Sequence, residues 1–160
     1  MAKEIKTNVM RILDREKRPY QCYFYEHGDE AVDGISVAQR LGQNPDQVFK
    51  TLVTKGASKR YYVFVIPVAK ELDLKAAARA VGEKSVAMLP VKELTPLTGY
   101  VRGGCSPIGM KKRFKTVLDQ SAADQAAILV SAGKIGCQVE LAPGDLAGLG
   151  GAGFADIIKE

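Results

Sequence analysis

Two pairs of apolar segments, each joined by a short turn, constrain the fold of this chain most. The first pair is 48–54 (VFKTLVT) and 61–67 (YYVFVIP), and the second is 127–131 (AILVS) and 137–141 (CQVEL). Parallel neighbours need a crossover of a dozen or more residues, whereas antiparallel neighbours can be joined by a tight turn. We therefore expect two antiparallel hairpins.

Helical segments alternate with these strands. Apolar residues at helical spacing near the N-terminus predict one helix, and Ser36 is the expected cap of a second that ends near Gly42. Asp73 and Gly82 bound the run LKAAARAV as cap and stop signal. The 160 residues contain no repeat and no linker. We expect one α/β (α+β) domain over residues 1–160, with a mixed, barrel-like sheet surrounded by helices.

Composition excludes several classes of protein. Apolar residues make up 46% and charged residues 26% of the chain, which is ordinary for a globular domain. No apolar run approaches the ~20 residues that a membrane span requires, and the N-terminus lacks an apolar signal segment. Cys22, Cys105 and Cys137 are widely spaced, and His27 is the single histidine. We expect a cytoplasmic protein that needs no metal, cofactor or membrane.

The net charge comes from one segment. The chain holds 23 Lys and Arg against 18 Asp and Glu, a net charge of +5. Residues 102–115 (RGGCSPIGMKKRFK) contain five cations and no acid, so the rest of the chain is balanced. The segment is either a solvated basic turn or a contact for an anionic partner. Its cations are Arg102, Lys111, Lys112, Arg113 and Lys115.

The same segment contains the most unusual motif, GGCSPIG at 103–109. Three glycines allow positive φ and close backbone approach, so the loop can aim several N–H groups at one anion or oxyanion. It resembles a nucleotide-binding phosphate loop, but Met110 stands where that loop requires lysine. A tight structural turn is the alternative. Cys105 within it has no neighbouring histidine to activate it as a nucleophile.

Lys50 stands out because it lies inside an apolar strand. Strict alternation places it on the same face as Val48 and Leu52. A lysine on an apolar face is costly unless its ammonium reaches solvent or an anion. It is either a protective lysine on an edge strand or a cation in a cleft that holds a phosphate or carboxylate.

Three strings in this order resemble the YbaK/EbsC family: VFKTL at 48–52, GGCSPIGMKK at 103–112 and SAGK at 131–134. The aromatic strand that ends at Tyr25-Glu26-His27 also fits. The resemblance covers nearly the whole chain, and the GGCSPIG form looks like the branch of bacterial Cys-tRNA(Pro)/Cys-tRNA(Cys) deacylases. It implies the fold of the editing domain of prolyl-tRNA synthetases.

The resemblance also implies an activity and its residues. It implies deacylation in trans of mischarged tRNA(Pro), possible partnership with prolyl-tRNA synthetase, and cation contacts from 102–115 to the tRNA backbone. Lys50 matches the essential, catalytic lysine of the family. The matching substrate-binding positions are Tyr25, Thr51, Gly103, Gly104, Cys105, Ser106, Pro107, Ile108, Gly109, Ser131 and Gly133.

The expected chemistry needs no protein nucleophile. The substrate is an ester, and a pocket accelerates its cleavage by orienting groups and stabilising an oxyanion. The resemblance suggests that the thiol of a cysteinyl ester attacks its own carbonyl and leaves as a thiolactone. The alternatives are a deacylase for another small amino acid such as alanine, or a non-catalytic module that binds aminoacyl-tRNA or a synthetase.

Overall fold

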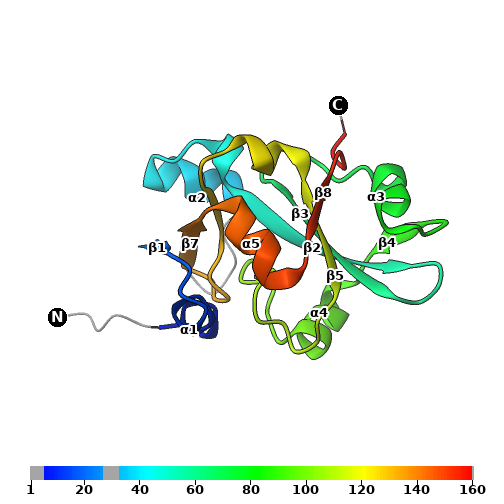
Figure 1. The fold of residues 1–160 in the computed structure, drawn as a ribbon, viewed down its shortest axis with the longest axis horizontal. Coiled ribbons are helices and arrows are strands. Elements are labelled where there is room, and N and C mark those ends of the chain that lie inside the picture. The colour runs from blue at the N-terminus through cyan, green and yellow to red at the C-terminus, as the bar shows by residue number, and fades with distance from the viewer. Residues whose placement is uncertain (1–5, 27–32, 160) are drawn as a thin grey trace.

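A computed structural model describes residues 6–26 and 33–159 of the chain. These residues form two β-sheets, five α-helices and two 3₁₀ helices (Figure 1). The helices are α1 (Asn8–Arg15), α2 (Gly34–Leu41), η1 (Pro45–Gln47), α3 (Leu74–Val81), α4 (Val91–Thr98), η2 (Gln120–Asp124) and α5 (Pro143–Gly150). The strands are β1 (Gln21–Phe24), β2 (Phe49–Gly56), β3 (Tyr61–Pro67), β4 (Val86–Met88), β5 (Lys115–Asp119), β6 (Ile128–Ser131), β7 (Cys137–Leu141) and β8 (Gly153–Ala155).

Both expected hairpins are confirmed. β2 and β3 pair antiparallel with Lys50 opposite Ile66, and β6 and β7 pair antiparallel with Ser131 opposite Gln138. The larger sheet has the order β4-β2-β3-β5-β8, in which β3, β5 and β8 run parallel. The smaller sheet has the order β1-β7-β6 and is antiparallel throughout.

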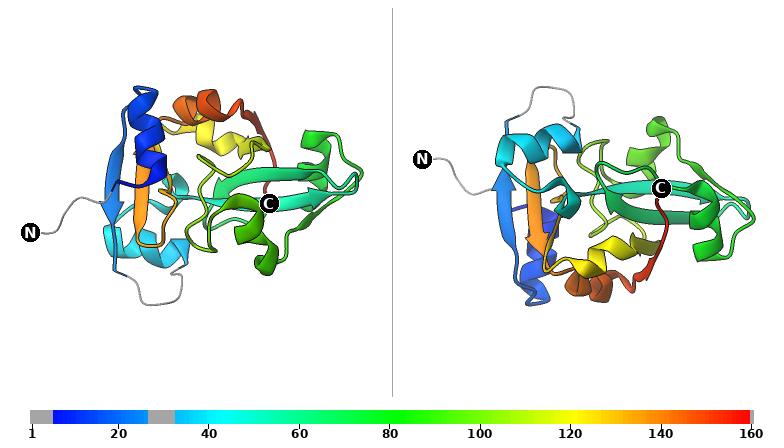
Figure 2. Two further views of the ribbon diagram at one scale, coloured as in Figure 1. Left: turned by 90° about the horizontal axis from the view of Figure 1, so that it is seen from below. Right: turned by 90° about the horizontal axis from the view of Figure 1, so that it is seen from above.

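The mixed α/β class is confirmed, but the barrel-like sheet divides into two sheets. Val48 and Leu129 form a single parallel bridge between the start of β2 and β6. Beyond this bridge no ladder continues between the two sheets in the described part of the chain. The strands of the smaller sheet run across the direction of β2 and β3 (Figure 2), so the two sheets meet at a corner and do not close a barrel.

Alternation along β2 and β3 divides the core between two faces. Phe49 and Val53 face the largest core cluster, which also contains α1, β6 and β7 residues such as Val9 and Val130. Phe64 and residues beside it face a second cluster under α3. Because successive strand residues point to opposite faces, neighbouring positions on β2 belong to different clusters.

The helix caps match those expected from the sequence, except at α2. Asp73 caps α3, and Gly82 ends it in the left-handed conformation with φ 74°. For α2 the expected cap was Ser36, but Asp33 caps the helix by accepting a hydrogen bond from the Ser36 N–H at 2.9 Å. An Asp carboxylate three residues before that N–H satisfies it, so Ser36 lies inside the first turn.

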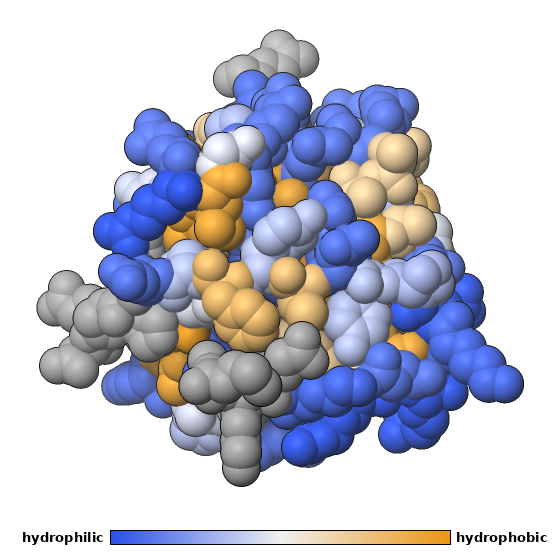
Figure 3. Space-filling view, turned by 90° about the vertical axis from the view of Figure 1, so that its left-hand side faces the viewer, coloured by the Kyte–Doolittle hydropathy of each residue, from blue (hydrophilic) through white to orange (hydrophobic). Residues whose placement is uncertain are grey.

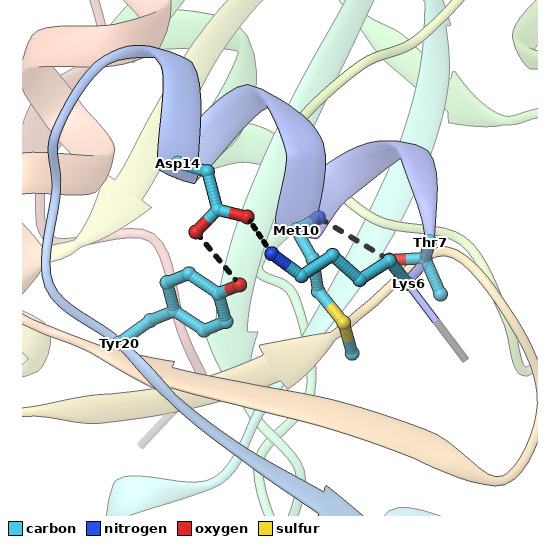
Figure 4. A network of polar contacts seen from close by, with 5 residues as sticks. All are labelled: Lys6, Thr7, Met10, Asp14 and Tyr20. Atoms are coloured by element: carbon cyan, nitrogen blue, oxygen red, sulfur yellow. Dashed lines mark hydrogen bonds and ion pairs between the residues drawn. The ribbon is translucent and has the colours of Figure 1, made fainter. Parts of the chain in front are cut away.

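The N-terminal helix is fixed by a small polar network (Figure 4). Thr7 caps α1 by accepting from the Met10 N–H at 3.3 Å. At the other end of the helix, Asp14 accepts from the Lys6 ammonium and from the Tyr20 hydroxyl. These contacts attach α1 to the segment that leads into β1.

The face that carries β1 has an apolar area bordered by hydrophilic residues (Figure 3). Phe24 of β1 is 51% exposed and Ile35 of α2 is 42% exposed.

Across the described ranges, no helix has the length and apolar character needed to cross a bilayer.

Candidate functional site

The candidate site lies where the two sheets separate. β2 is bridged to β6 at Val48, and its pairing with β4 begins only at Thr54. Between these points the outer edge of β2 forms no ladder with another described strand, although its other edge pairs fully with β3. Lys50 and Thr51 both lie in this gap.

The bridge relates the positions of Lys50 and Ser131. Lys50 lies two residues beyond Val48, Ser131 lies two residues beyond Leu129, and the bridge between Val48 and Leu129 is parallel, after which the two strands diverge. Residues two apart point to the same face of a strand. Val48 and Leu129 share one core cluster, so Lys50 and Ser131 project on the side of that cluster.

Gln138 extends this arrangement and was missed by sequence reasoning. It pairs with Ser131 on one side and with Tyr23 on the other, so Tyr23, Gln138 and Ser131 form a row across the three strands of the smaller sheet. Gln138 is 6% exposed, and its Oε1 accepts from Nε2 of Gln43 at 2.9 Å. A glutamine at an inward position of the short strand CQVEL was the available signal.

Lys50 is a half-buried cation whose ammonium forms no ion pair and no hydrogen bond with any described residue. Burial lowers its pKa from the ordinary value of 10.5, and the more distant charge of Glu71 opposes that shift. Glu71 itself pairs with Lys159 at 3.3 Å. An ammonium without a partner in a partly buried position is available to a phosphate or carboxylate.

Thr51 points to the opposite side of β2, towards the cluster that contains Cys105 and Ile108 of the glycine segment. Its hydroxyl is buried and has no hydrogen-bond partner within the described residues. The structure therefore places Lys50 and Thr51 in the same gap but on different faces of the strand.

The glycine segment 103–109 packs against the turn that follows β6. A Cβ on Gly104 would lie 2.9 Å from the Ile135 amide nitrogen, so this glycine permits direct backbone contact. Gly103 has φ 84° and Gly109 has φ 78°, which glycine adopts without strain. The structure thus brings into contact the segments 103–109 and 131–135, which form two walls and both contain expected substrate-binding positions.

Two backbone amides of this segment, both on buried residues, lack an acceptor among the described residues. The Gly104 N–H donates to the Val101 carbonyl at 3.0 Å, and the Ile108 N–H donates to the buried Ser106 hydroxyl at 3.3 Å. The amides of Cys105 and Ser106 donate to no acceptor in the described part of the chain. Successive free N–H groups are the donors that an oxyanion requires.

Cys105 does not have the properties of a nucleophile. Its side chain is buried, and burial raises the pKa of the thiol to about 12. A thiolate is the reactive form, and it is scarce at neutral pH for such a group. Cys137 is likewise buried, with its pKa raised to about 11. His27 lies outside the described residues.

Tyr25 lies just beyond the end of β1 and contacts the second wall. Its N–H donates to the Gly136 carbonyl at 3.0 Å. With Thr7 and Lys134 it lines a cavity of about 200 Å³. Gly133 in the same turn has φ 94° and lies against Tyr100, and its N–H donates to the Ser131 hydroxyl at 3.1 Å.

The five cations of 102–115 are all exposed, but they do not form one cluster. Lys112 and Arg113 line a cavity of about 240 Å³ between Pro107, α1 and α5. Arg113 and Lys115 line a second cavity at the end of the β2–β3 hairpin. Lys111 lies against Gly99.

Residues 6–26 and 33–159 contain no group of three His, Cys, Asp or Glu side chains that could hold a metal ion.

The fold and the matched family define the class of protein. Residues 29–149 match the model of the aminoacyl-tRNA editing domain. The fold is similar to that of "hypothetical protein APE2540", with a TM-score of 0.84, 22% identity and coverage of 94% of this chain and 99% of that one. It is also similar to "a putative trans-editing enzyme for prolyl tRNA synthetase", with a TM-score of 0.79, 24% identity and coverage of 96% and 99%.

A relative supports the same assignment. The "Putative Cys-tRNA(Pro)/Cys-tRNA(Cys) deacylase EbsC" of Enterococcus faecalis (strain ATCC 700802 / V583) is 49% identical over 152 residues, which cover 95% of this chain and 93% of the relative. The chain belongs to the aminoacyl-tRNA editing domain family. The resemblance to the YbaK/EbsC family is confirmed.

Proposed function

We propose that this protein is a trans-editing deacylase that removes cysteine from mischarged tRNA(Pro), and from Cys-tRNA(Cys) as a second substrate. The observation that carries the proposal is the half-buried Lys50 ammonium, which lies without a described partner where β2 and β6 separate. The name of the 49% identical relative supports the substrate. Prolyl-tRNA synthetase is the proposed partner that presents mischarged tRNA.

In this proposal Lys50 holds a phosphate or the ribose of the terminal adenosine. Ser131 lies beside the gap in the β2 edge, and Thr51 lies on the opposite face of β2 from Lys50, towards the glycine segment. The amides of Cys105 and Ser106 in that segment hold the carbonyl oxygen of the aminoacyl ester. Fixed amide donors favour the oxyanion that develops during attack over the neutral carbonyl. The exposed cations of 102–115 contact the acceptor-arm backbone without reading sequence.

The substrate thiol supplies the nucleophile in this mechanism. Its sulfur forms a bond to the ester carbonyl carbon, and the bond from that carbon to the ribose oxygen breaks. The proton of the thiol passes to the departing ribose hydroxyl, which releases free tRNA and a cyclic thiolactone. The high pKa of the buried Cys105 thiol fits a reaction in which the protein contributes no nucleophile.

The test is deacylation of labelled Cys-tRNA(Pro) by catalytic amounts of protein. We expect Lys50→Ala to lower kcat/KM by about 100-fold or more, since it removes a charged contact to the bound end of the substrate. Lys70→Ala, which removes an exposed lysine from the turn after β3, is the matched control and retains activity. Full activity of a folded Lys50→Ala variant would overturn the assignment.

Substrate choice and turnover need a separate panel. Cys-tRNA(Pro), Cys-tRNA(Cys) and Ala-tRNA(Pro) are compared with and without prolyl-tRNA synthetase. The proposal expects many turnovers on the cysteinyl substrates and faster editing when the synthetase is present. Stoichiometric binding without release of amino acid would identify a binding module instead.

A further inference from the structure

A groove at the far end of β2 and β3 combines cations with aromatic rings. Its residues enclose about 390 Å³ and come from the β2–β3 hairpin, α3 and the start of β5. We call it the hairpin groove, and its lining residues are Arg60, Tyr61, Tyr62, Val81, Arg113, Phe114 and Lys115.

Strand register brings these distant segments together. β3 and β5 pair in parallel with Tyr62 opposite Lys115, so Arg113 and Phe114 enter beside the hairpin just before that pair. The Tyr61 and Phe114 rings pack edge to face with their centroids 5.8 Å apart. Arg60 was not among the residues that the sequence analysis singled out, because it lies more than fifty positions before Arg113 in the chain.

The charge of the groove is strongly positive. Arg60, Arg113 and Lys115 line it, and the Lys55 ammonium lies 5.7 Å from the centroid of the Tyr61 ring. No ion pair among the described residues includes any of these four cations. Arg113 donates to the Leu149 carbonyl at 3.0 Å, which uses one of its five N–H groups.

One acid lies beside the groove and is already occupied. Glu83 accepts from the Tyr62 hydroxyl at 2.6 Å and also from the Ser58 hydroxyl. The hydrogen bond from Ser58 is the main cause that lowers the pKa of Glu83, so it stays ionised at neutral pH. Four cations against one carboxylate leave a net positive surface for an extended anion.

We propose that the hairpin groove binds the sugar-phosphate backbone of the tRNA acceptor arm. Exposed cations that track phosphates, next to half-buried aromatic rings, are the combination that binds nucleic acid without sequence preference. Lys50 and Lys55 are five residues apart on one strand, which corresponds to about 17 Å. This equals about five stacked nucleotides at ~3.4 Å each, so the groove meets the arm just behind its single-stranded end.

The inference rests on the proposed function, but its test does not depend on activity. The variant is Arg60→Gln, Arg113→Gln and Lys115→Gln together. The matched control is Arg11→Gln, Lys75→Gln and Lys92→Gln, which removes the same charge from exposed positions on α1, α3 and α4. The dissociation constant for uncharged tRNA is measured at several salt concentrations for both and for the parent.

We expect the groove variant to bind tRNA at least about tenfold more weakly at low salt. The magnitude of the slope of log K against log salt decreases by about two to three, because each cation that is removed loses one phosphate contact. The control variant keeps the parental slope. Cleavage of cysteinyl adenosine, which lacks the arm, stays within about twofold of the parent for both.

Parental affinity and slope in the groove variant would overturn the inference, as would an equal loss in the control variant. A groove variant that loses only its affinity for prolyl-tRNA synthetase would also overturn it, because the groove would then bind protein. Failure of the proposed function is distinct, since the parent would then release no cysteine while its tRNA binding still tests the groove.

Discussion

Lys50 of β2 and Ser131 of β6 each lie two residues beyond the bridge between Val48 and Leu129, which is the single backbone bridge between their strands in the described part of the chain. Neither residue pairs with the other strand in a ladder, so the space beside them belongs to no sheet. A strand edge without a ladder partner leaves its side chains and backbone groups open to a ligand. The site that we propose for editing is therefore a consequence of where the two sheets part.

The buried position of Lys50 predicts a pH dependence of stability. Burial lowers its pKa in the folded protein from the ordinary 10.5, so at high pH the unfolded chain holds the proton longer. Stability rises with pH wherever the unfolded state binds more protons. We expect the free energy of unfolding of the parent, relative to Lys50→Met, to increase as the pH approaches 10.5.

Denaturant melts of the parent and Lys50→Met at several pH values measure this difference. The other groups that titrate at high pH are present in both proteins and cancel. A difference that stays constant or falls with pH would mean that Lys50 is not penalised by burial.

A change at Thr51 is expected to raise stability and to lower activity. Its buried hydroxyl has no described partner, and such a group costs about 1–3 kcal/mol. Thr51→Val should raise the free energy of unfolding by about 1 kcal/mol and reduce kcat/KM for Cys-tRNA(Pro). Equilibrium unfolding and kinetics on the same preparation check both; a less stable variant would show that the hydroxyl is satisfied in the folded protein.

Two glycines whose φ lies outside the left-handed region allow the cost of a close contact to be measured separately from the cost of an unfavourable backbone conformation. Gly104→Ala places a Cβ 2.9 Å from the Ile135 nitrogen, which the backbone must relieve by moving. We expect a loss of about 1–3 kcal/mol in stability and a larger loss in deacylation. Gly144→Ala in α5 meets nothing within 4 Å, so it should be neutral or stabilising and fully active. Equal effects of the two changes would contradict the contact between the two walls.

The three cysteines should differ in reactivity. Cys22 is exposed, whereas Cys105 and Cys137 are buried with pKa values raised to about 12 and about 11. Mass spectrometry after a short alkylation at pH 8 should therefore find modification at Cys22 alone. Cys105→Ala should keep kcat within about twofold when it is measured at 20 °C, below the temperature at which a destabilised variant would unfold. An inactive but folded variant would show that Cys105 takes part in the reaction.

The local features of this fold were predictable, and the distant ones were not. Alternation and short turns were sufficient for both hairpins, and Asp73 with Gly82 was sufficient for α3. The parallel pairing of β5 with β3 and of β8 with β5 was not predicted, because β5 begins nearly fifty residues after β3 ends and β8 is only three residues long. No local signal reports such pairings.

The candidate site shows the same division. Lys50 and the glycine segment were recognisable as unusual residues for their surroundings. Gln138 was not, because its importance comes from its neighbours Ser131 and Tyr23 on adjacent strands. Arg60 became notable only when β3 placed it beside the basic segment. Register across strands therefore supplied what the sequence pattern lacked.

The bridge between Val48 and Leu129 also has a kinetic consequence. The two residues are 81 positions apart, and contacts this distant in sequence are slow to form because loop closure precedes any gain from them. On refolding, editing activity should therefore return after the hairpins have formed. On mild warming, separation of the smaller sheet would abolish turnover while much of the secondary structure remains.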